Sequence, residues 1–177
     1  MSGLNKGIER VGVQLSWDPA PAGAPDRDLD LIAATYRTDD RYGDPAYLVH
    51  FDSRAPDGTI TLHRDSRTGR GFGADEAMTL ELGRLSESYG RVVVGVAIQQ
   101  GGGRLTFGDV ARPGVRITEG YRELAVEGFA SVAWATAAAV AEFVRDGAGA
   151  WVHRPGVRGF DADPTAFAEQ MGRKPEA

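Results

Sequence analysis

The segment Ser131-Val-Ala-Trp-Ala-Thr-Ala-Ala-Ala-Val-Ala-Glu-Phe-Val-Arg145 is open to two interpretations, and the fold class depends on which of them is right. Alanine is the best helix-forming residue, so the composition favours a helix. Against this, residues 140–145 alternate in character, and the Gly-rich run Asp146-Gly147-Ala148-Gly149 leads directly into Trp151-Val152-His153-Arg154. Two strands joined by a short Gly-rich turn would give the same pattern. Local propensity and patterning leave helix and strand equally open.

Outside this segment, the sequence consists of short apolar stretches of strand length. Val, Ile, Leu, Thr and aromatic residues dominate them, and Gly, Pro, Asp or Asn bound most of them. The 24 glycines and 9 prolines are spread along the chain, which is typical of many short elements. The sequence therefore predicts an all-β fold, a β-sandwich, with strands within 8–17, 29–36, 46–51, 59–62, 78–82, 92–98 and 115–117.

Two local signals concern a turn and a helix. Proline presets φ at the second position of a turn and glycine accepts a positive φ, so we expect Ala55-Pro56-Asp57-Gly58 to close a hairpin. Near the end, Asp163-Pro164 is typical of a helix start and predicts a short helix over 165–171. We expect a single domain over 1–177, with the sandwich in about 8–160 and the helix and a tail in 161–177.

Composition excludes several classes of function. The chain of 177 residues has 25 acidic and 20 basic residues and a net charge of −5, so no nucleic-acid partner is expected. With no cysteines and three histidines, any bound metal should be a hard cation held by oxygen. No apolar run is long enough to span a membrane, and residues 1–7 lack the pattern of a signal peptide, so we expect a cytoplasmic protein.

Two acidic segments could bind such a cation. In the first, Asp28 and Asp30 are two residues apart, so on an extended chain both carboxylates leave the same face. The second runs from Asp65 to Glu76 and reads Asp-Ser-Arg-Thr-Gly-Arg-Gly-Phe-Gly-Ala-Asp-Glu. Its alternating glycines allow a tight backbone with inward carbonyl groups, and carboxylates stand at both of its ends. Carboxylate and carbonyl oxygens are the ligands of calcium, which takes about six to eight of them.

The second segment does not match two familiar loops. Read as an EF-hand, it has Arg67 and Arg70 at the third and sixth positions, where an oxygen ligand and a glycine are required. Read as a phosphate-binding loop, it lacks the lysine and the helix that follow such a loop. Two further interpretations stay open, namely solvated turn acids beside arginines, and a glycosidase pair formed by Asp28 and Glu76.

Residues 65–76 resemble the loop that marks the TerD domain, the family of tellurium-resistance and general stress proteins. That loop usually reads Gly-Asp-Asn-x-Thr-Gly-x-Gly-x-Gly-Asp-Asp-Glu. Other segments are similar to the family pattern in the same order along the chain. They are Val13-Gln14-Leu15-Ser16-Trp17-Asp18, Asp28-Leu29-Asp30, the turn within 51–58, the apolar stretch 92–98, Phe107-Gly108-Asp109-Val110, and the closing pair formed by 136–145 and Trp151. The ordered set is specific, although no single segment is.

The resemblance implies a fold and a set of metal ligands. The fold is a β-sandwich of two mostly antiparallel sheets with short helical pieces, in which the Ala-rich segment is a strand. The acidic loops at one end of the sandwich would bind Ca²⁺. Carried over to matching positions, the ligands are the side chains of Asp28, Asp30, Asp65, Asp75 and Glu76, together with main-chain oxygens near Gly69 and Gly71. No catalytic residue and no other cofactor is implied.

Several positions depart from the family pattern. Ser66 replaces the usual Asn, Arg70 stands where an acid is frequent, Ala74 replaces the first Asp of the acidic trio, and Gln99-Gln100 replaces a common His-Asp pair. Family members often hold two calcium ions. Because carboxylates are lost and a positive charge is gained, we expect one ion here, or none in a degenerate member.

The implied function is that of a calcium-binding stress-response or tellurite-resistance protein. It would act without enzymatic activity, as an interaction module for protein partners of a stress-response system. The alternative is a calcium-dependent carbohydrate- or lipid-binding sandwich, in which a loop-bound ion bridges to sugar hydroxyls or lipid phosphates. The missing secretion signal and the net acidity weigh against this alternative.

Overall fold

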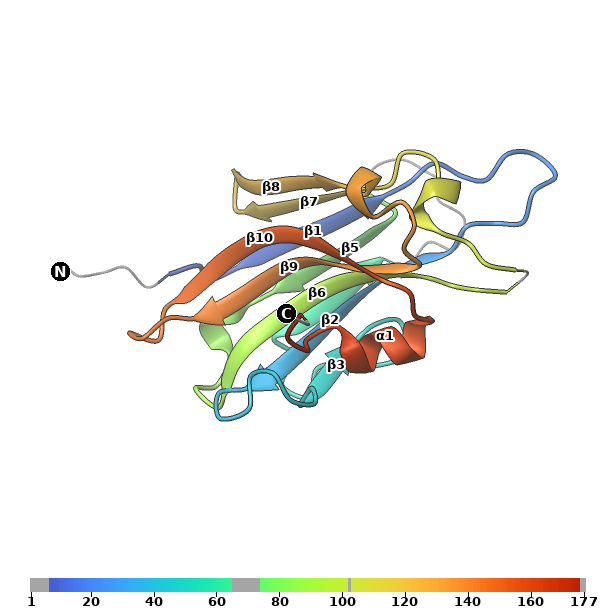
Figure 1. Cartoon of the computed structure of the whole chain (residues 1–177). Coiled ribbons are helices and arrows are strands. Elements are labelled where there is room, and N and C mark those ends of the chain that lie inside the picture. Colours follow the sequence, from blue (N-terminus) through green and yellow to red (C-terminus); the bar gives the residue numbers. More distant parts are fainter. Residues whose placement is uncertain (1–6, 65–73, 102, 176–177) are drawn as a thin grey trace.

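The protein folds as two five-stranded sheets with an α-helix against the outer face of one of them (Figure 1). The structure is a computed structural model and describes residues 7–64, 74–101 and 103–175. Neighbouring strands in both sheets pair antiparallel. The predicted all-β sandwich of antiparallel sheets with short helical pieces is confirmed.

The first sheet, which we call the β1 sheet, has the order β4-β5-β1-β7-β8. Its central strand alternates strictly, since Val11, Val13 and Leu15 are buried while Gln14 and Ser16 are exposed. Such alternation marks a sheet with one face on the core and one face in water. The strands are β1 (Val11–Ser16), β4 (Ile60–Arg64), β5 (Glu76–Leu80), β7 (Gly114–Glu119) and β8 (Arg122–Gly128).

The second sheet, which we call the β6 sheet, has the order β10-β9-β6-β2-β3. In two of its inner strands, β2 and β6, nearly every residue is buried, because the sheet is covered on both faces. The Ala-rich segment forms β9, so the strand interpretation is confirmed, and it forms a hairpin with β10. The strands are β2 (Leu29–Arg37), β3 (Tyr47–Val49), β6 (Tyr89–Ile98), β9 (Ala137–Arg145) and β10 (Trp151–Phe160).

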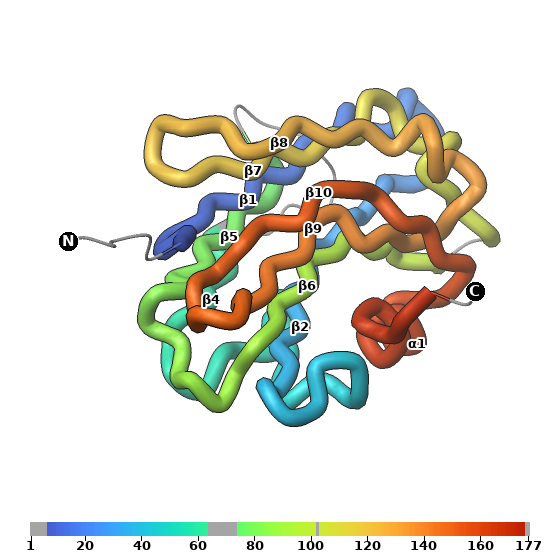
Figure 2. The backbone as a smooth tube through the Cα atoms, turned by 60° about the vertical axis from the view of Figure 1, so that its left-hand side comes forward, coloured from blue at the N-terminus to red at the C-terminus, as the bar shows by residue number. Residues whose placement is uncertain are grey.

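Helix α1 (Pro164–Gln170) covers the outer face of the β6 sheet, on the side away from the β1 sheet (Figure 2). The Asp163 carboxylate caps the helix by accepting a hydrogen bond from Ala166 N at 2.8 Å, which confirms the predicted helix start. The ring of Phe167 is fully buried and lies against Gly95, where any Cβ atom would collide with it. The remaining helical pieces are the 3₁₀ turns η1 (Leu82–Arg84), η2 (Phe107–Asp109) and η3 (Ala130–Val132).

The turn at residues 55–58 forms, but the predicted hairpin is wrong. Gly58 has φ of 72° and its amide donates to Ala55 O at 3.4 Å, as the turn chemistry requires. However, β3 pairs with β2 in one sheet, and β4 pairs with β5 in the other. Residues 50–59 therefore cross from the edge of one sheet to the edge of the other. A turn motif specifies a local change of direction, whereas long-range pairing decides which sheet the next strand joins.

Three arginines hold the end of the sandwich where β9 finishes and β6 begins, and we call Arg41, Arg91 and Arg145 the arginine end. Arg91 is buried, and its guanidinium donates to Glu142 Oε2 at 2.5 Å and to the main-chain oxygens of Arg41 and Gly172. Arg41 donates to Arg145 O at 2.9 Å. Arg145 donates to four carbonyl oxygens, those of Leu85, Ser86, Tyr89 and Gly149.

Tyr36 is buried beside this network. The guanidinium carbon of Arg91 lies 5.2 Å from the centre of the Tyr36 ring. Burial raises the pKa of the Tyr36 hydroxyl to about 12, although the positive charge of Arg91 acts in the opposite direction. The tyrosine is therefore held neutral in the folded protein to high pH.

No helix within the described ranges combines the length and the apolar character that crossing a membrane requires.

Candidate functional site

The two acidic segments of the sequence begin strands in different sheets. Asp28 and Asp30 lie at the start of β2, in the β6 sheet, and Asp75 and Glu76 lie at the start of β5, in the β1 sheet. Both strand starts lie at the right-hand end of the molecule in Figure 1. We call Asp28, Asp30, Asp75 and Glu76 the acidic end. It is opposite the arginine end, because β2 runs from one to the other.

Glu76 links the two sheets. Its side chain is completely buried, and its Oε1 atom accepts a hydrogen bond from Leu31 N at 3.1 Å. Leu31 belongs to β2, so a carboxylate from one sheet reaches the backbone of the other, one residue from Asp30. An ionised carboxylate in such a place loses most of its hydration.

Asp75 fixes the segment that precedes β2. It is 3% exposed, and its Oδ2 atom accepts a hydrogen bond from Trp17 N at 2.8 Å. The indole nitrogen of Trp17 in turn donates to Arg27 O at 3.0 Å, directly before Asp28. The chain between β1 and β2 is thus tied to the start of β5 by main-chain and side-chain contacts of one tryptophan.

Asp30 is held by the segment that follows β6. It is 2% exposed, and its Oδ2 atom accepts a hydrogen bond from Gln99 Nε2 at 2.6 Å. The main-chain nitrogen of Gln99 donates to Asp28 O at 2.8 Å. The side chain of Gln100 then closes the following loop, because it donates to the main-chain oxygen of Leu105 and accepts from its main-chain nitrogen. Gln99 thus contacts both acids of the first segment.

Four of the seven predicted site residues are therefore brought to one end of the fold. Asp65, Gly69 and Gly71 lie outside the described residues, and their assignment stays a prediction. Arg64, the last described residue before them, is opposite Ala77 in the pairing of β4 with β5. The described chain on either side of this segment thus lies beside Glu76.

The donor atoms at the acidic end are suited to a hard cation in their chemistry, since all of them are oxygen. Among the described residues alone, no group of three or more His, Asp or Glu side chains is arranged to hold a metal ion. A complete coordination shell would need main-chain oxygens or the predicted ligands at Asp65, Gly69 and Gly71. The His63 ring is engaged by Thr79 Oγ1, at 2.6 Å.

Two residues with a part in this arrangement were missed in the sequence. In the sequence, Gln99 stands only as a departure from the family pattern, and Trp17 only as part of a segment similar to that pattern. Trp17 is buried, and it also donates two hydrogen bonds at the acidic end. Its position next to Asp18, directly after a strand, was the available signal. For Gln99, the signal was its position after the central apolar stretch.

Comparisons with known proteins identify one family. The family model of the TerD domain matches residues 1–170. Two proteins named tellurium resistance protein TerD, from an Alcaligenes species and from Serratia marcescens, are each 28% identical over 112 residues, or 62% of this chain. An uncharacterized protein of Bacillus subtilis, YceE, is 26% identical over 118 residues. The match spans 58% of the length of the two TerD proteins.

Two solved structures have a higher sequence identity to this chain than the relatives above. The crystal structure of a homologue of the telluride resistance protein TerD from Streptomyces coelicolor A3(2) has 57% sequence identity and a TM-score of 0.93. It covers 96% of this chain and 100% of that chain. A crystal structure of a protein of unknown function has 55% identity and a TM-score of 0.93, and it covers 96% of this chain and 99% of that chain.

Proposed function

Because the chain belongs to the TerD domain family of tellurium-resistance proteins, we propose that it binds one calcium ion at its acidic end and acts without enzymatic activity, as an interaction module in stress response and tellurite resistance. The observation that carries the calcium proposal is the position of Glu76. Its fully buried carboxylate contacts the backbone of the opposite sheet beside Asp30, which is itself buried.

Buried carboxylates that lie close together are costly in free energy. Each loses hydration on burial, and like charges repel one another more strongly in a poorly polarisable interior. Asp30, Asp75 and Glu76 accept hydrogen bonds from an amide group and two main-chain N–H groups. A divalent cation would neutralise this charge. Oxygen ligands, and no Cys in the chain, favour a hard ion such as Ca²⁺ over a soft one.

The residues that would hold the ion are Asp28, Asp30, Asp75 and Glu76, with the predicted contributions of Asp65 and of main-chain oxygens near Gly69 and Gly71. Bound there, calcium supplies positive charge and no redox chemistry. The four carboxylates come from the starts of strands in both sheets, so their attachment to one ion would fasten the sheets together at this end. The loops around it would then present a fixed surface to a protein partner.

A thermal melt of chelator-treated protein with Ca²⁺, Mg²⁺ or neither ion tests the calcium proposal. Binding to the folded state alone contributes about 2.7 kcal/mol at a hundredfold excess over the dissociation constant. For a chain of this size, we expect Ca²⁺ to raise the melting temperature by about 5–10 °C. Mg²⁺ should have less effect, because it prefers a smaller and more rigid shell. A melting temperature indifferent to calcium contradicts the proposal.

Two variants locate the ion. Asp65→Ala should remove most of the calcium-dependent shift, because it deletes a predicted ligand. Glu123→Gln, at an exposed position on β8, serves as the control and should keep the full shift. If Asp65→Ala also keeps the full shift, the ion binds elsewhere.

The interaction role is tested in cells that depend on this chain for growth on tellurite. We expect the Asp65→Ala variant to fail where Glu123→Gln succeeds, at equal protein levels. Equal growth of the Asp65→Ala and Glu123→Gln strains would show that tellurite resistance does not require calcium binding at this site.

A further inference from the structure

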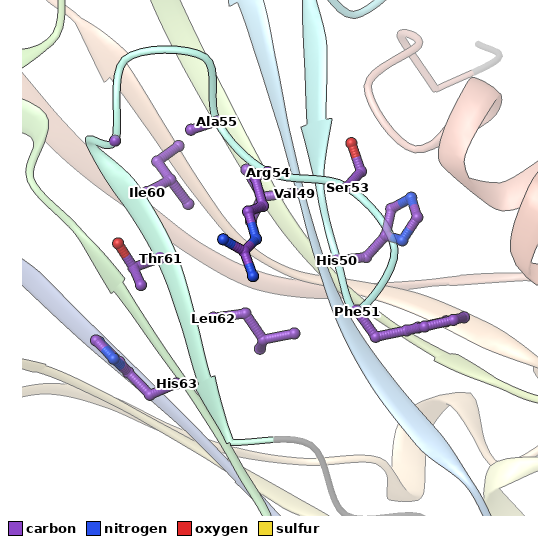
Figure 3. Close-up of a pocket in the computed structure, with 11 residues that line it drawn as sticks. Val49, His50, Phe51, Ser53, Arg54, Ala55, Ile60, Thr61, Leu62 and His63 are labelled. Carbon is purple, nitrogen blue, oxygen red and sulfur yellow. The ribbon is translucent and has the colours of Figure 1, made fainter.

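The crossing from β3 to β4 leaves a cleft on one side of the sandwich. β3 is the edge strand of the β6 sheet and β4 is the edge strand of the β1 sheet, and residues 50–59 connect them. Because the two edges belong to different sheets, no ladder of hydrogen bonds joins them. A cavity of about 510 Å³ lies here, within the size range of small-molecule sites, and Figure 3 shows the residues that line it.

The floor of this cleft is aliphatic. Val49 and Ile60 are part of the main core and are each only 2% exposed, while Leu62 is half-buried at the edge of the same core. In Figure 3, the side chains of Ile60 and Leu62 point from β4 into the cleft. Thr61 and His63, between and after them, point to the other face of the strand. The cleft therefore offers an apolar surface continuous with the protein interior.

The charge of the cleft is opposite to that of the whole chain. The described residues that line it include Arg54 and His50, and none of them is Asp or Glu, although the net charge of the chain is −5. Burial lowers the pKa of His50, which favours its neutral form. Arg54 therefore supplies the positive charge.

Arg54 is positioned to receive an anion. Figure 3 shows its guanidinium group in the space between β3 and β4, on the side of Ile60 and Leu62. Among the described residues, its side chain has no ion pair and no hydrogen bond, in contrast to Arg91 and Arg145 at the arginine end. A guanidinium binds a carboxylate through two parallel hydrogen bonds, and an aliphatic chain gains free energy on aliphatic surface.

We propose that this cleft binds a small aliphatic carboxylate, whose carboxylate group pairs with Arg54 and whose hydrocarbon chain lies against Ile60 and Leu62. The proposed pairing uses none of the predicted calcium ligands, and its occupation does not require calcium. The protein would then have two binding sites, one for calcium at the acidic end and one for an amphipathic anion in the cleft.

Titration of the full chain with sodium octanoate, in the presence of a calcium chelator and followed by amide NMR, tests the proposal. We expect saturable shifts of the amide signals of Arg54, Ile60 and Leu62. Acetate, which has the anion without the chain, and octylammonium, which has the chain with the opposite charge, should each bind at least about tenfold more weakly. Equal binding of octanoate and octylammonium, or shifts confined to other faces, would overturn the proposal.

Arg54→Gln is the matched variant. Because Arg54 is exposed and has no partner among the described residues, the variant should keep the wild-type spectrum and melting temperature. Its affinity for octanoate should fall about tenfold, whereas Arg116→Gln, on the outer face of β7, should bind as the wild type does. Unchanged octanoate affinity in Arg54→Gln would rule out the proposed pairing. Because calcium is absent throughout, the octanoate titration can fail or succeed independently of the thermal melts that test calcium binding.

Discussion

The arginine end and the acidic end both bury charged side chains at strand termini, but their chemistry is opposite. At the arginine end, guanidinium groups donate to main-chain carbonyl oxygens and to Glu142. At the acidic end, carboxylates accept from the neutral groups of Trp17, Leu31 and Gln99. An arginine carries five donors, and a strand end offers many carbonyl oxygens to receive them.

This difference in chemistry indicates that the arginine end has a structural role and that the acidic end can respond to a bound cation. The arginine network is completed by groups of the chain itself, and the one acid in it is paired. A carboxylate oxygen can accept hydrogen bonds and can also coordinate a cation, which a guanidinium group cannot do. We therefore expect the stability of the arginine end to be independent of calcium and that of the acidic end to depend on it.

The largest effect should come from Arg91→Gln. This change leaves Glu142 without its buried partner and removes donors to Arg41 O and Gly172 O. Breaking a buried ion pair costs about 3–5 kcal/mol, and Arg154 at 3.9 Å from Glu142 places the expected loss near the lower limit. Urea denaturation, with and without calcium, should give the same loss in both conditions. If calcium abolishes this loss of stability, the arginine end and the acidic end are energetically coupled, and the expectation is wrong.

Arg154→Gln is the control for Arg91→Gln. Its side chain is 57% exposed, and exposed ion pairs contribute little. The free energy of unfolding should change by less than about 1 kcal/mol.

Glu76→Gln should have an intermediate effect that appears only with calcium. The amide keeps the size of the side chain and an oxygen that can accept from Leu31 N, but it removes the negative charge. In chelator, the variant should be as stable as the wild type or more stable, since a buried charge is removed. With calcium, it should lack the roughly 2.7 kcal/mol that the wild type gains at a hundredfold excess over the dissociation constant. Destabilisation of equal size in both solutions would assign Glu76 a structural role.

The smallest effect at neutral pH, and a specific one at high pH, is expected for Tyr36→Phe. The Tyr36 hydroxyl is buried without a hydrogen-bond partner among the described residues, so the variant should be nearly as stable as the wild type at pH 7. Its folded pKa of about 12 lies above the value of 10 for an exposed tyrosine. Between these values the unfolded chain has released a proton that the folded protein keeps, so stability falls as the pH rises.

Denaturation of both proteins at several pH values measures this difference. Relative to Tyr36→Phe, the wild type should lose about 1 kcal/mol per pH unit between roughly pH 10 and 12. Below pH 10 the two curves should run parallel. Parallel curves across the whole range would show that the arginine end accommodates the tyrosinate.

Much of the fold could be predicted because apolar periodicity is a local property. Strict alternation marks β1, whose outer face meets water, and a continuous apolar run marks β6, which is covered on both sides. The Ala-rich strand β9 needed more than local propensity. Its small side chains lie between two neighbouring strands, β6 and β10, and tertiary pairing overrides the helix preference of alanine.

The rest depends on contacts between distant residues. Nothing in Ala55-Pro56-Asp57-Gly58 states that the next strand joins the other sheet. Likewise, the role of Gln99 follows from the register that puts Leu29 opposite Ile98, and so brings Gln99 beside Asp28 and Asp30. The acidic residues were found through the ordered motifs of the family. Their composition alone does not distinguish ligands from solvated turn acids.

Helix α1 has a consequence for the synthesis of the chain. It follows the ten strands described, and Phe167 enters the recess above Gly95. Until that residue has left the ribosome, Ile32, Val93 and Phe160 lack their cover on the outer face of the β6 sheet. A nascent chain halted before Pro164 therefore displays an apolar patch of the kind that chaperones recognise, and α1, which follows all ten described strands, is the element that covers it.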